Sequence, residues 1–201
     1  MFGAKGGMRF TAGGCIAAGA LLLLCSAAVS LRAWFWQERH AEAFAAADTP
    51  STPSLDVAPA SRAGHQPLRG EALALLRVPR LGIETVVAEG TDPRTLLLGP
   101  GHMEGSALPG EPDNCIIAGH RDGPFGRLRS ARPGDVVEIA DRARVKRYRV
   151  ESVETVRKDD LRPLAPTRTP ILTLITCYPF DYVGRAPRRF IVRASFLEDR
   201  T

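Results

Sequence analysis

The chain has 201 residues, of which 44% are hydrophobic and 24% are charged. This length fits one domain with an appendage, and the composition excludes wholesale disorder, a collagen-like repeat and a polytopic membrane protein. The formal net charge is +5, but cations and anions are interleaved along most of the chain without a long basic run. The sequence therefore gives no indication of a nucleic-acid partner.

An apolar segment near the N-terminus predicts a membrane anchor. The 22 residues from Phe10 to Leu31 carry no charge, and at about 1.5 Å per helical residue they can cross a hydrocarbon core of ~30 Å. The aromatic run 34–36 follows, as in the belt at a membrane surface. A cleaved signal peptide with small residues near Ser30 is the alternative. The length of the run and the aromatics after it favour an uncleaved anchor at residues 10–36.

The cations around this segment indicate its orientation. Lys5 and Arg9 stand on the short N-terminal side, so the positive-inside rule predicts that residues 1–9 are cytoplasmic. We therefore expect a single-pass protein of the inner or plasma membrane whose folded part is extracytoplasmic, a compartment in which disulfides are permitted.

Two further segments follow the anchor. Residues 37–69 are rich in Ala, Pro, Ser and Thr and predict a semi-extended linker, with a short helical continuation to about Ala47. Residues 70–201 are long enough to hold one hydrophobic core. We expect them to form the folded domain.

Short apolar runs, separated by Gly, Pro and Asp, predict an all-β fold for this domain. The predicted strands are Ala72–Val78, Ile83–Ala88, Cys115–Ala118, Val136–Ile139, Val145–Val156 with a break near Ser152, Ile171–Thr176 and Phe190–Phe196. Most connections are too short for helical crossovers, and no long helical period competes. This pattern is typical of a β-sandwich or a closed barrel with short helices and loops.

Two predicted strands end in residues that can carry chemistry. One strand runs into His120 and the other into Cys177. A thiol becomes a nucleophile only as the thiolate, which a nearby imidazole or guanidinium favours. On the last strand, alternation puts Phe190 on the core face and Arg189 on the opposite face, so Arg189 is better placed than Arg188 to join such a site.

Other interpretations of the same residues remain open on spacing alone. Cys177 is also consistent with a small buried side chain, or with a structural disulfide to Cys115. A metal site formed by Cys115, His120, Cys177 and His102 has no support, because the spacing matches no familiar ligand pattern. Papain-like enzymes place the cysteine before the histidine, opposite to the order in this chain.

Four segments of the chain, taken in order, carry a recognisable pattern. They are the loop 101–111, the histidine segment 118–122, the run 173–177 (Thr-Leu-Ile-Thr-Cys) and the arginine segment 188–192. Together they resemble the sortases, the membrane-anchored cysteine transpeptidases of bacterial surfaces, whose TLxTC signature the run 173–177 matches. The resemblance covers about residues 72–196, and the order His, Cys, Arg and the anchor–linker–domain layout agree with the family.

The resemblance implies a closed sortase-type β-barrel and a catalytic triad of His120, Cys177 and Arg189, with Arg188 as the reserve candidate for the arginine. It implies no cofactor and no metal. The expected substrate is a surface protein with a C-terminal, LPxTG-like sorting signal, cleaved through a thioacyl intermediate. The amine acceptor is a cell-wall precursor or a protein. Tyr178-Pro179 and the short interval to the arginine resemble class D or Gram-negative sortases. His102 matches a recurrent loop position without an assigned role.

Two rival functions share these features. A hydrolase would form the same acyl-enzyme and resolve it with water. A tethered, non-catalytic β-domain that binds an envelope partner would keep Cys177 only for packing. The reactivity of the thiol separates the second rival from the enzymes.

Overall fold

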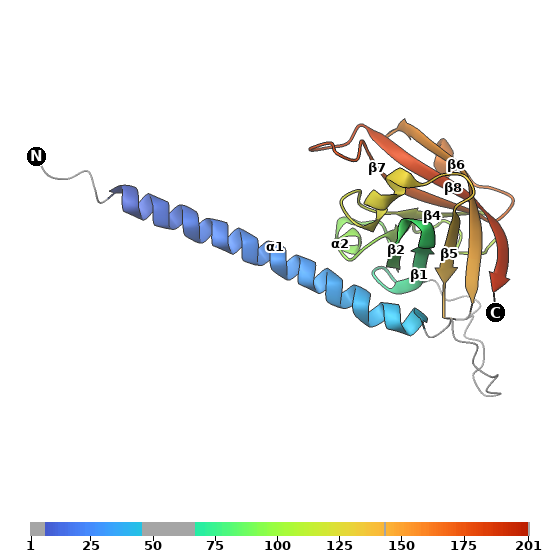
Figure 1. The fold of residues 1–201 in the computed structure, drawn as a ribbon, viewed down its shortest axis with the longest axis horizontal. Coiled ribbons are helices and arrows are strands. Elements are labelled where there is room, and N and C mark those ends of the chain that lie inside the picture. Colours follow the sequence, from blue (N-terminus) through green and yellow to red (C-terminus); the bar gives the residue numbers. More distant parts are fainter. Residues whose placement is uncertain (1–6, 46–66, 143, 201) are drawn as a thin grey trace, which may run out of the picture.

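The computed structural model describes residues 7–45, 67–142 and 144–200. Most of the predicted N-terminal segment 1–9 and of the predicted linker 37–69 therefore lies outside the described residues. The described parts form a long N-terminal helix, α1, and a barrel of strands beside the C-terminal end of that helix (Figure 1).

Helix α1 spans Gly7–Ala45 without interruption. Among the described residues it is long and apolar enough to cross a membrane, in agreement with the candidate anchor. The side chains from 13 to 32 are all exposed, so the barrel covers none of this stretch. The helix continues through residues 37–45, where the sequence predicted the beginning of the linker and a short helical continuation.

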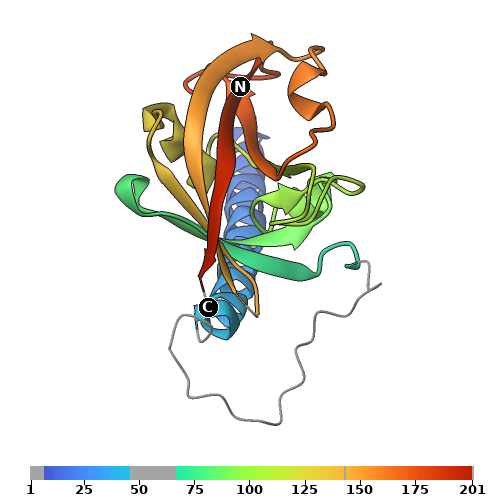
Figure 2. The ribbon, with the colours of Figure 1, turned by 90° about the vertical axis from the view of Figure 1, so that its right-hand side faces the viewer.

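The described residues of the folded part contain eight strands that close into a barrel. Their bounds are β1 (Ala72–Val78), β2 (Ile83–Glu89), β3 (Gly101–His102), β4 (Asn114–Ala118), β5 (Val136–Ala140), β6 (Val145–Arg157), β7 (Ile171–Tyr178) and β8 (Arg188–Arg200). Around the barrel the order is β1-β2-β3-β4-β7-β8-β6-β5, and Figure 2 shows the sheet curling round on itself. The predicted closed all-β barrel is confirmed.

The connections contain the short helices α2 (Pro93–Leu96), η2 (Pro79–Leu81), η3 (Pro124–Ser130) and η4 (Arg162–Leu164). Each predicted strand corresponds to one in the barrel, whereas β3 was not predicted because it has only two residues. The predicted break near Ser152 is wrong. There β6 shifts its register with β8 between Val150 and Ser152 and continues as one strand, as a β-bulge allows.

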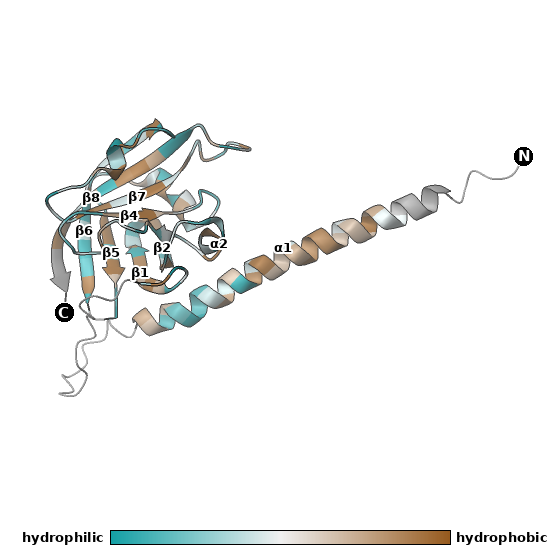
Figure 3. Cartoon of the chain, turned by 180° about the vertical axis from the view of Figure 1, so that it is seen from behind, coloured by the Kyte–Doolittle hydropathy of each residue, from teal (hydrophilic) through white to brown (hydrophobic). Residues whose placement is uncertain are grey.

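Alternation along the strands places the core inside the barrel. Leu172 and Leu174 of β7 pack in this core with Phe190, Val192 and Ala194 of β8, as the sequence predicted for one face of the last strand. The intervening residues of both strands lie on the opposite face of the sheet, where Thr173 and Ile191 are also buried. In Figure 3 apolar and polar residues alternate along several strands, while α1 is apolar along its middle part and more hydrophilic toward its C-terminal end.

Candidate functional site

Three neighbouring strands bring the predicted site residues to one edge of the barrel. Strand β4 runs parallel to β7, and β7 runs antiparallel to β8. The carboxyl ends of β4 and β7 and the beginning of β8 therefore meet at the same edge. His120 follows β4, Cys177 stands near the end of β7, and Arg189 stands near the start of β8.

The register pairs the thiol with one arginine. Cys177 lies directly opposite Arg189, whereas Arg188 lies opposite Tyr178. Directly opposed residues of antiparallel strands have their side chains on the same face, with Cβ atoms about 4.5–5.5 Å apart. Both Cys177 and Arg189 are half-buried, and Arg188 is exposed. The parity argument that favoured Arg189 over Arg188 agrees with this geometry.

The guanidinium of Arg189 already lies against backbone carbonyls at the base of β8. Its Nη1 donates to the Arg188 carbonyl at 2.9 Å and to the Ala186 carbonyl at 3.3 Å. Both acceptors are neutral, so an oxyanion placed near this group would offer the guanidinium a stronger, charge-assisted hydrogen bond.

The pairing of β4 with β7, continued by Gly119, places His120 at the same height along the strands as Cys177. Ala118 lies opposite Ile175, so two further residues on each strand lead to His120 and Cys177. Gly119 holds this alignment: its N–H donates to the Ile175 carbonyl at 3.0 Å, and its carbonyl accepts from Thr176 Oγ1 at 2.8 Å. The imidazole of His120 is exposed at the edge.

Gly119 also meets a steric requirement. A Cβ atom at this position would lie 2.7 Å from the Phe125 ring, closer than carbon atoms approach. Phe125 is fully buried in the barrel core. Gly119 therefore allows the backbone to run close to the Phe125 ring, and the next residue, His120, exposes its imidazole to solvent.

The second cysteine of the folded domain has a different environment. Cys115 is buried in the core of the barrel, and this burial raises the pKa of its thiol. It lies opposite Leu172, five residues before Cys177, which corresponds to about 16 Å along the strand. A disulfide needs Cα atoms about 4.4–6.8 Å apart. The structural disulfide left open by the sequence is therefore excluded, and both thiols are free.

Among the residues that the structure describes, no three His, Cys, Asp or Glu side chains gather into a group that could hold a metal ion.

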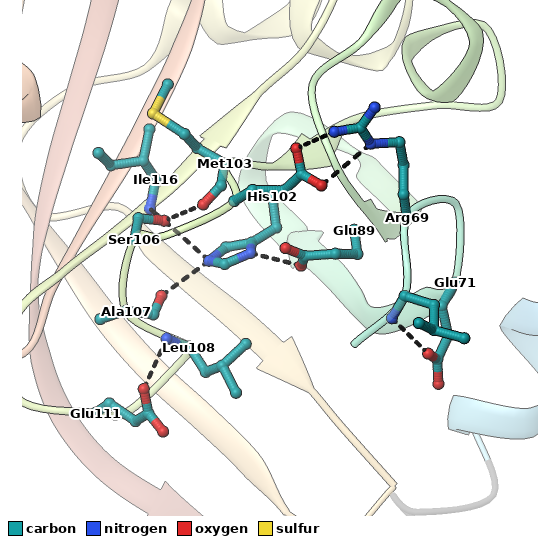
Figure 4. A network of polar contacts seen from close by, with 12 residues as sticks. Arg69, Glu71, Glu89, His102, Met103, Ser106, Ala107, Leu108, Glu111 and Ile116 are labelled. Carbon is teal, nitrogen blue, oxygen red and sulfur yellow. Dashed lines mark hydrogen bonds and ion pairs between the residues drawn. The ribbon is translucent and has the colours of Figure 1, made fainter. Parts of the chain in front are cut away.

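His102, which had no role in the sequence analysis, lies in a buried polar network (Figure 4). Its Nδ1 is 2.7 Å from Glu89 Oε2, and its Nε2 is 2.9 Å from the Ala107 carbonyl. Ser106 Oγ lies 2.9 Å from the same Nε2, donates to the Met103 carbonyl and accepts from the Ile116 N–H. The network ties β2, β3 and β4 to the loop between β3 and β4.

The partners in this network fix one donor of His102. The Ala107 carbonyl can only accept a hydrogen bond, and the Ser106 hydroxyl already donates to Met103, so Nε2 must be the donor. Nδ1 and Glu89 Oε2 share a second hydrogen bond. His102 and Glu89 are 1% and 5% exposed. This buried hydrogen-bonded pair fixes the loop leading to β4.

We expect Glu89→Ala to lower the free energy of unfolding by about 2 kcal/mol, because it leaves Nδ1 of the buried His102 without its hydrogen-bond partner. Urea unfolding of the folded domain measures the change. Glu84→Ala, on the same strand, is the matched control. Glu84 pairs with Arg77 while its side chain is 61% exposed, so we expect a change within about 0.5 kcal/mol. Equal losses in the two variants would contradict the role of the buried pair.

Arg121 is a site-edge residue whose role sequence reasoning missed. Its guanidinium donates to the carbonyls of Pro179 at 3.0 Å, Gly184 at 3.1 Å and Tyr182, all in the loop between β7 and β8. The loop connects Cys177 to Arg189, so Arg121 holds together the segment that flanks both. The only sequence signal was a cation directly after the histidine, which does not specify these carbonyls.

The comparisons with known proteins agree with this geometry. A family model of the sortase domain matches residues 76–197. The chain is 34% identical over 133 residues to sortase D of Bacillus subtilis (strain 168), covering 66% of this chain and 67% of that protein. This chain belongs to the sortase family.

Solved sortases share the barrel. The Clostridium perfringens sortase D5 transpeptidase aligns with a TM-score of 0.61 and 27% identity, over 66% of this chain and 83% of that one. Sortase E1 from Streptomyces coelicolor, solved with a tripeptide in its active site, aligns with a TM-score of 0.58 and 25% identity, over 67% and 93%. Sortases are cysteine transpeptidases, so transpeptidation is the general activity of this family.

Proposed function

We propose that this sortase is a membrane-anchored cysteine transpeptidase in which Cys177, His120 and Arg189 carry the reaction. The observation that carries the proposal is the strand register: Cys177 lies opposite Arg189 and level with the residue that follows Gly119. Three groups from distant parts of the sequence thus face one edge of a rigid barrel, as a preorganised site requires.

Cys177 acts as the nucleophile. Its thiolate attacks a backbone carbonyl of an extended peptide, so that a C–S bond forms and the carbonyl oxygen becomes an oxyanion. The half-buried position supports this role, because the residue is only partly covered and is held by a paired strand. The buried Cys115 offers no such access.

Arg189 stabilises the oxyanion. When negative charge develops on the carbonyl oxygen, the guanidinium can exchange a neutral carbonyl partner for this charged one. The exchange lowers the free energy of the transition state relative to that of the bound peptide. Such a hydrogen bond contributes to rate because it strengthens only as the charge appears.

His120 transfers the protons. As imidazolium it donates a proton to the departing amine while the C–N bond breaks, which leaves a thioester on Cys177. An incoming amine then attacks the thioester, His120 takes its proton, and the thiolate is released. The net reaction exchanges one amide bond for another and consumes no water.

The proposed substrate is a surface protein with a C-terminal, LPxTG-like sorting signal, and the proposed acceptor is an amine of a cell-wall precursor or of a protein. Both follow from membership of the family. The tripeptide held in the active site of the Streptomyces coelicolor enzyme supports a peptide ligand at this edge of the barrel.

We further propose that α1 anchors the protein in the inner or plasma membrane, with the N-terminus in the cytoplasm and the barrel outside. The exposed apolar face along residues 13–32 supports the anchor, since no part of the barrel covers it. Lys5 and Arg9 support the orientation.

The test of the proposed function is product analysis with and without an added amine. A fluorescent peptide carrying a sorting motif is incubated with the full-length protein, and the products are separated by mass. Transpeptidation predicts a product joined to the amine. Only the shortened acid, at every amine concentration, would indicate hydrolysis, and an unchanged peptide with an unreactive Cys177 would indicate the non-catalytic binding domain.

The rate of transpeptidation is expected to follow a bell-shaped curve with pH. The active form needs Cys177 as thiolate and His120 as imidazolium, so acid removes the nucleophile and alkali removes the proton donor. Initial rates measured across the pH range at saturating amine check this expectation. A rate that rises to a plateau and stays there at alkaline pH would exclude the imidazolium from the rate-determining step.

A further inference from the structure

The last turns of α1 pack against the barrel. One face of the helix is buried or half-buried here, and its residues recur every three or four positions: Ala33, Trp36, Gln37, His40, Ala41 and Phe44. The stretch before Ala33 is exposed on all sides. The barrel contact therefore begins within one turn of the end of the uncharged run at Leu31.

Two side chains hold this contact. The Gln37 amide donates from Nε2 to the carbonyls of Val86 at 3.0 Å and Leu98 at 2.9 Å, and its Oε1 accepts from the Val86 N–H at 2.7 Å and from Thr85 Oγ1 at 3.2 Å. Phe44 is 1% exposed and packs in a second apolar cluster with barrel residues. A helix held at both ends of the contact has a defined orientation on the barrel.

With α1 as the proposed anchor, the second cluster marks the end of the contact that lies far from the membrane. Besides Phe44 it contains Leu75, Val86, Ala140 and Val145. Ala140 ends β5 and Val145 begins β6, so the β5–β6 hairpin lies beside the last turn of α1. Phe44 is seven residues beyond Gln37, or about 10 Å farther along the helix.

Gln37 itself lies close to the bilayer surface. It is six residues beyond Leu31, the last residue of the uncharged run, which corresponds to about 9 Å of helix. The headgroup layer on each side of a bilayer is about 5–8 Å thick. Barrel segments that contact Gln37 therefore lie at the outer boundary of the headgroups, and segments that reach back beyond it enter that layer.

Two barrel segments reach back in this direction. Figure 1 shows α2 and the loop 179–187 between β7 and β8 on the side of the barrel that faces the N-terminal half of α1, and Figure 3 shows the same from behind. Both carry exposed apolar side chains: Leu97, directly after α2, is 55% exposed, and Val183, in the loop, is 95% exposed. Arg94 of α2 and Arg185 of the loop are also exposed.

The chemistry of the two segments fits a lipid surface. Apolar side chains gain by entering the boundary between headgroups and acyl chains, and arginines pair with lipid phosphates. Tyr182, next to Val183, is 45% exposed and adds an aromatic ring of the kind found at membrane interfaces. Arg121 holds the loop carbonyls, so the loop presents these residues in a fixed shape.

We propose that α2 with Leu97 and Leu98, together with the loop 179–187, forms a membrane-facing surface that rests on phospholipid headgroups. The proposal rests on the proposed role of α1 as an anchor. Cys177 and Arg189 flank the loop 179–187, so in this orientation the edge of the barrel that carries them lies next to the bilayer. The enzyme then acts on peptide bonds held close to the membrane surface.

Site-specific photo-crosslinking tests the orientation. Benzoylphenylalanine is placed at Leu97 or at Val183 in the full-length protein, which is reconstituted in nanodiscs of equal parts phosphatidylcholine and phosphatidylglycerol. Arg142, an exposed residue of the β5–β6 hairpin, is the matched control. After irradiation, mass spectrometry counts protein–lipid adducts. We expect adducts at Leu97 and Val183 to exceed those at Arg142 several-fold, and equal or absent adducts at all three positions would overturn the proposal.

A double variant tests the helix contact itself. Gln37→Ala combined with Phe44→Ala removes the hydrogen bonds of the Gln37 amide and the buried Phe44 ring. The barrel should then lose its fixed orientation on α1, and the excess of adducts at Leu97 should fall several-fold. An unchanged excess would contradict the role of this contact.

The catalytic proposal is measured separately in the same nanodiscs by labelling the Cys177 thiol with a reactive peptide mimic. A labelled thiol without lipid adducts overturns only the orientation, whereas lipid adducts with an unreactive thiol overturn only the catalytic role.

Discussion

Cys177→Ala is expected to lower the rate of transpeptidation at least about 10,000-fold, because without the sulfur no thioester forms. The barrel should keep its stability, since Cys177 is half-buried and contributes little to the core. Amine-dependent product formation from a sorting peptide measures the rate, and urea unfolding measures the stability. The loss should appear in kcat rather than in KM alone.

Cys115→Ala is the matched control for this variant. Its thiol lies in the core of the same barrel at 1% exposure, opposite Leu172 and away from the catalytic edge. We expect this variant to keep its activity and to lose about 1 kcal/mol of stability from the small cavity. If Cys177→Ala retained a substantial rate, or if Cys115→Ala lost it with the fold intact, the assignment of the nucleophile would be wrong.

Arg189→Ala is expected to lower kcat about 100- to 1,000-fold, the effect of removing one oxyanion donor from a preorganised site. The guanidinium lies opposite Cys177 and is half-buried, so solvent screens it less than a surface charge. Steady-state kinetics with the sorting peptide measure the loss. Arg189→Lys should recover only part of the rate, because an ammonium group cannot reproduce the planar guanidinium geometry.

The neighbouring arginine provides the control. Arg188 is exposed and lies opposite Tyr178, so Arg188→Ala should change kcat by less than about threefold, as for a surface charge away from the reacting atoms. A large loss in Arg188→Ala together with a small loss in Arg189→Ala would reverse the assignment of the two residues.

The local pattern of the sequence was sufficient for the strands. Short apolar runs predicted the strands at 171–176 and 190–196, and alternation in 190–196 also predicted the face that packs in the core, because a strand with one buried face must repeat every two residues. The two-residue β3 had too few residues to show a period. The register shift in β6 lies where a break near Ser152 was predicted, but the pairing with β8 continues past it.

The candidate active-site residues at the edge of the barrel could be predicted only in part from the sequence. The motif around Cys177 and the order of His120, Cys177 and Arg189 indicated the family, and parity chose between the two arginines. The opposition of Cys177 to Arg189 depends on the pairing of β7 with β8, which the sequence of either strand alone does not specify. The pairing of His102 with Glu89 had no local signal, because the two residues lie on different strands.

The sequence by itself determined an apolar helix, an all-β domain and a set of candidate residues, because each of these depends on nearby residues and their periodicity. Only the tertiary structure decided which thiol is buried, that β7 pairs with β8 so that Cys177 lies opposite Arg189, and that the last turns of α1 lie against the barrel. These features depend on register and on contacts between distant segments, such as Gln37 with Val86, and such contacts form only when the whole chain has folded.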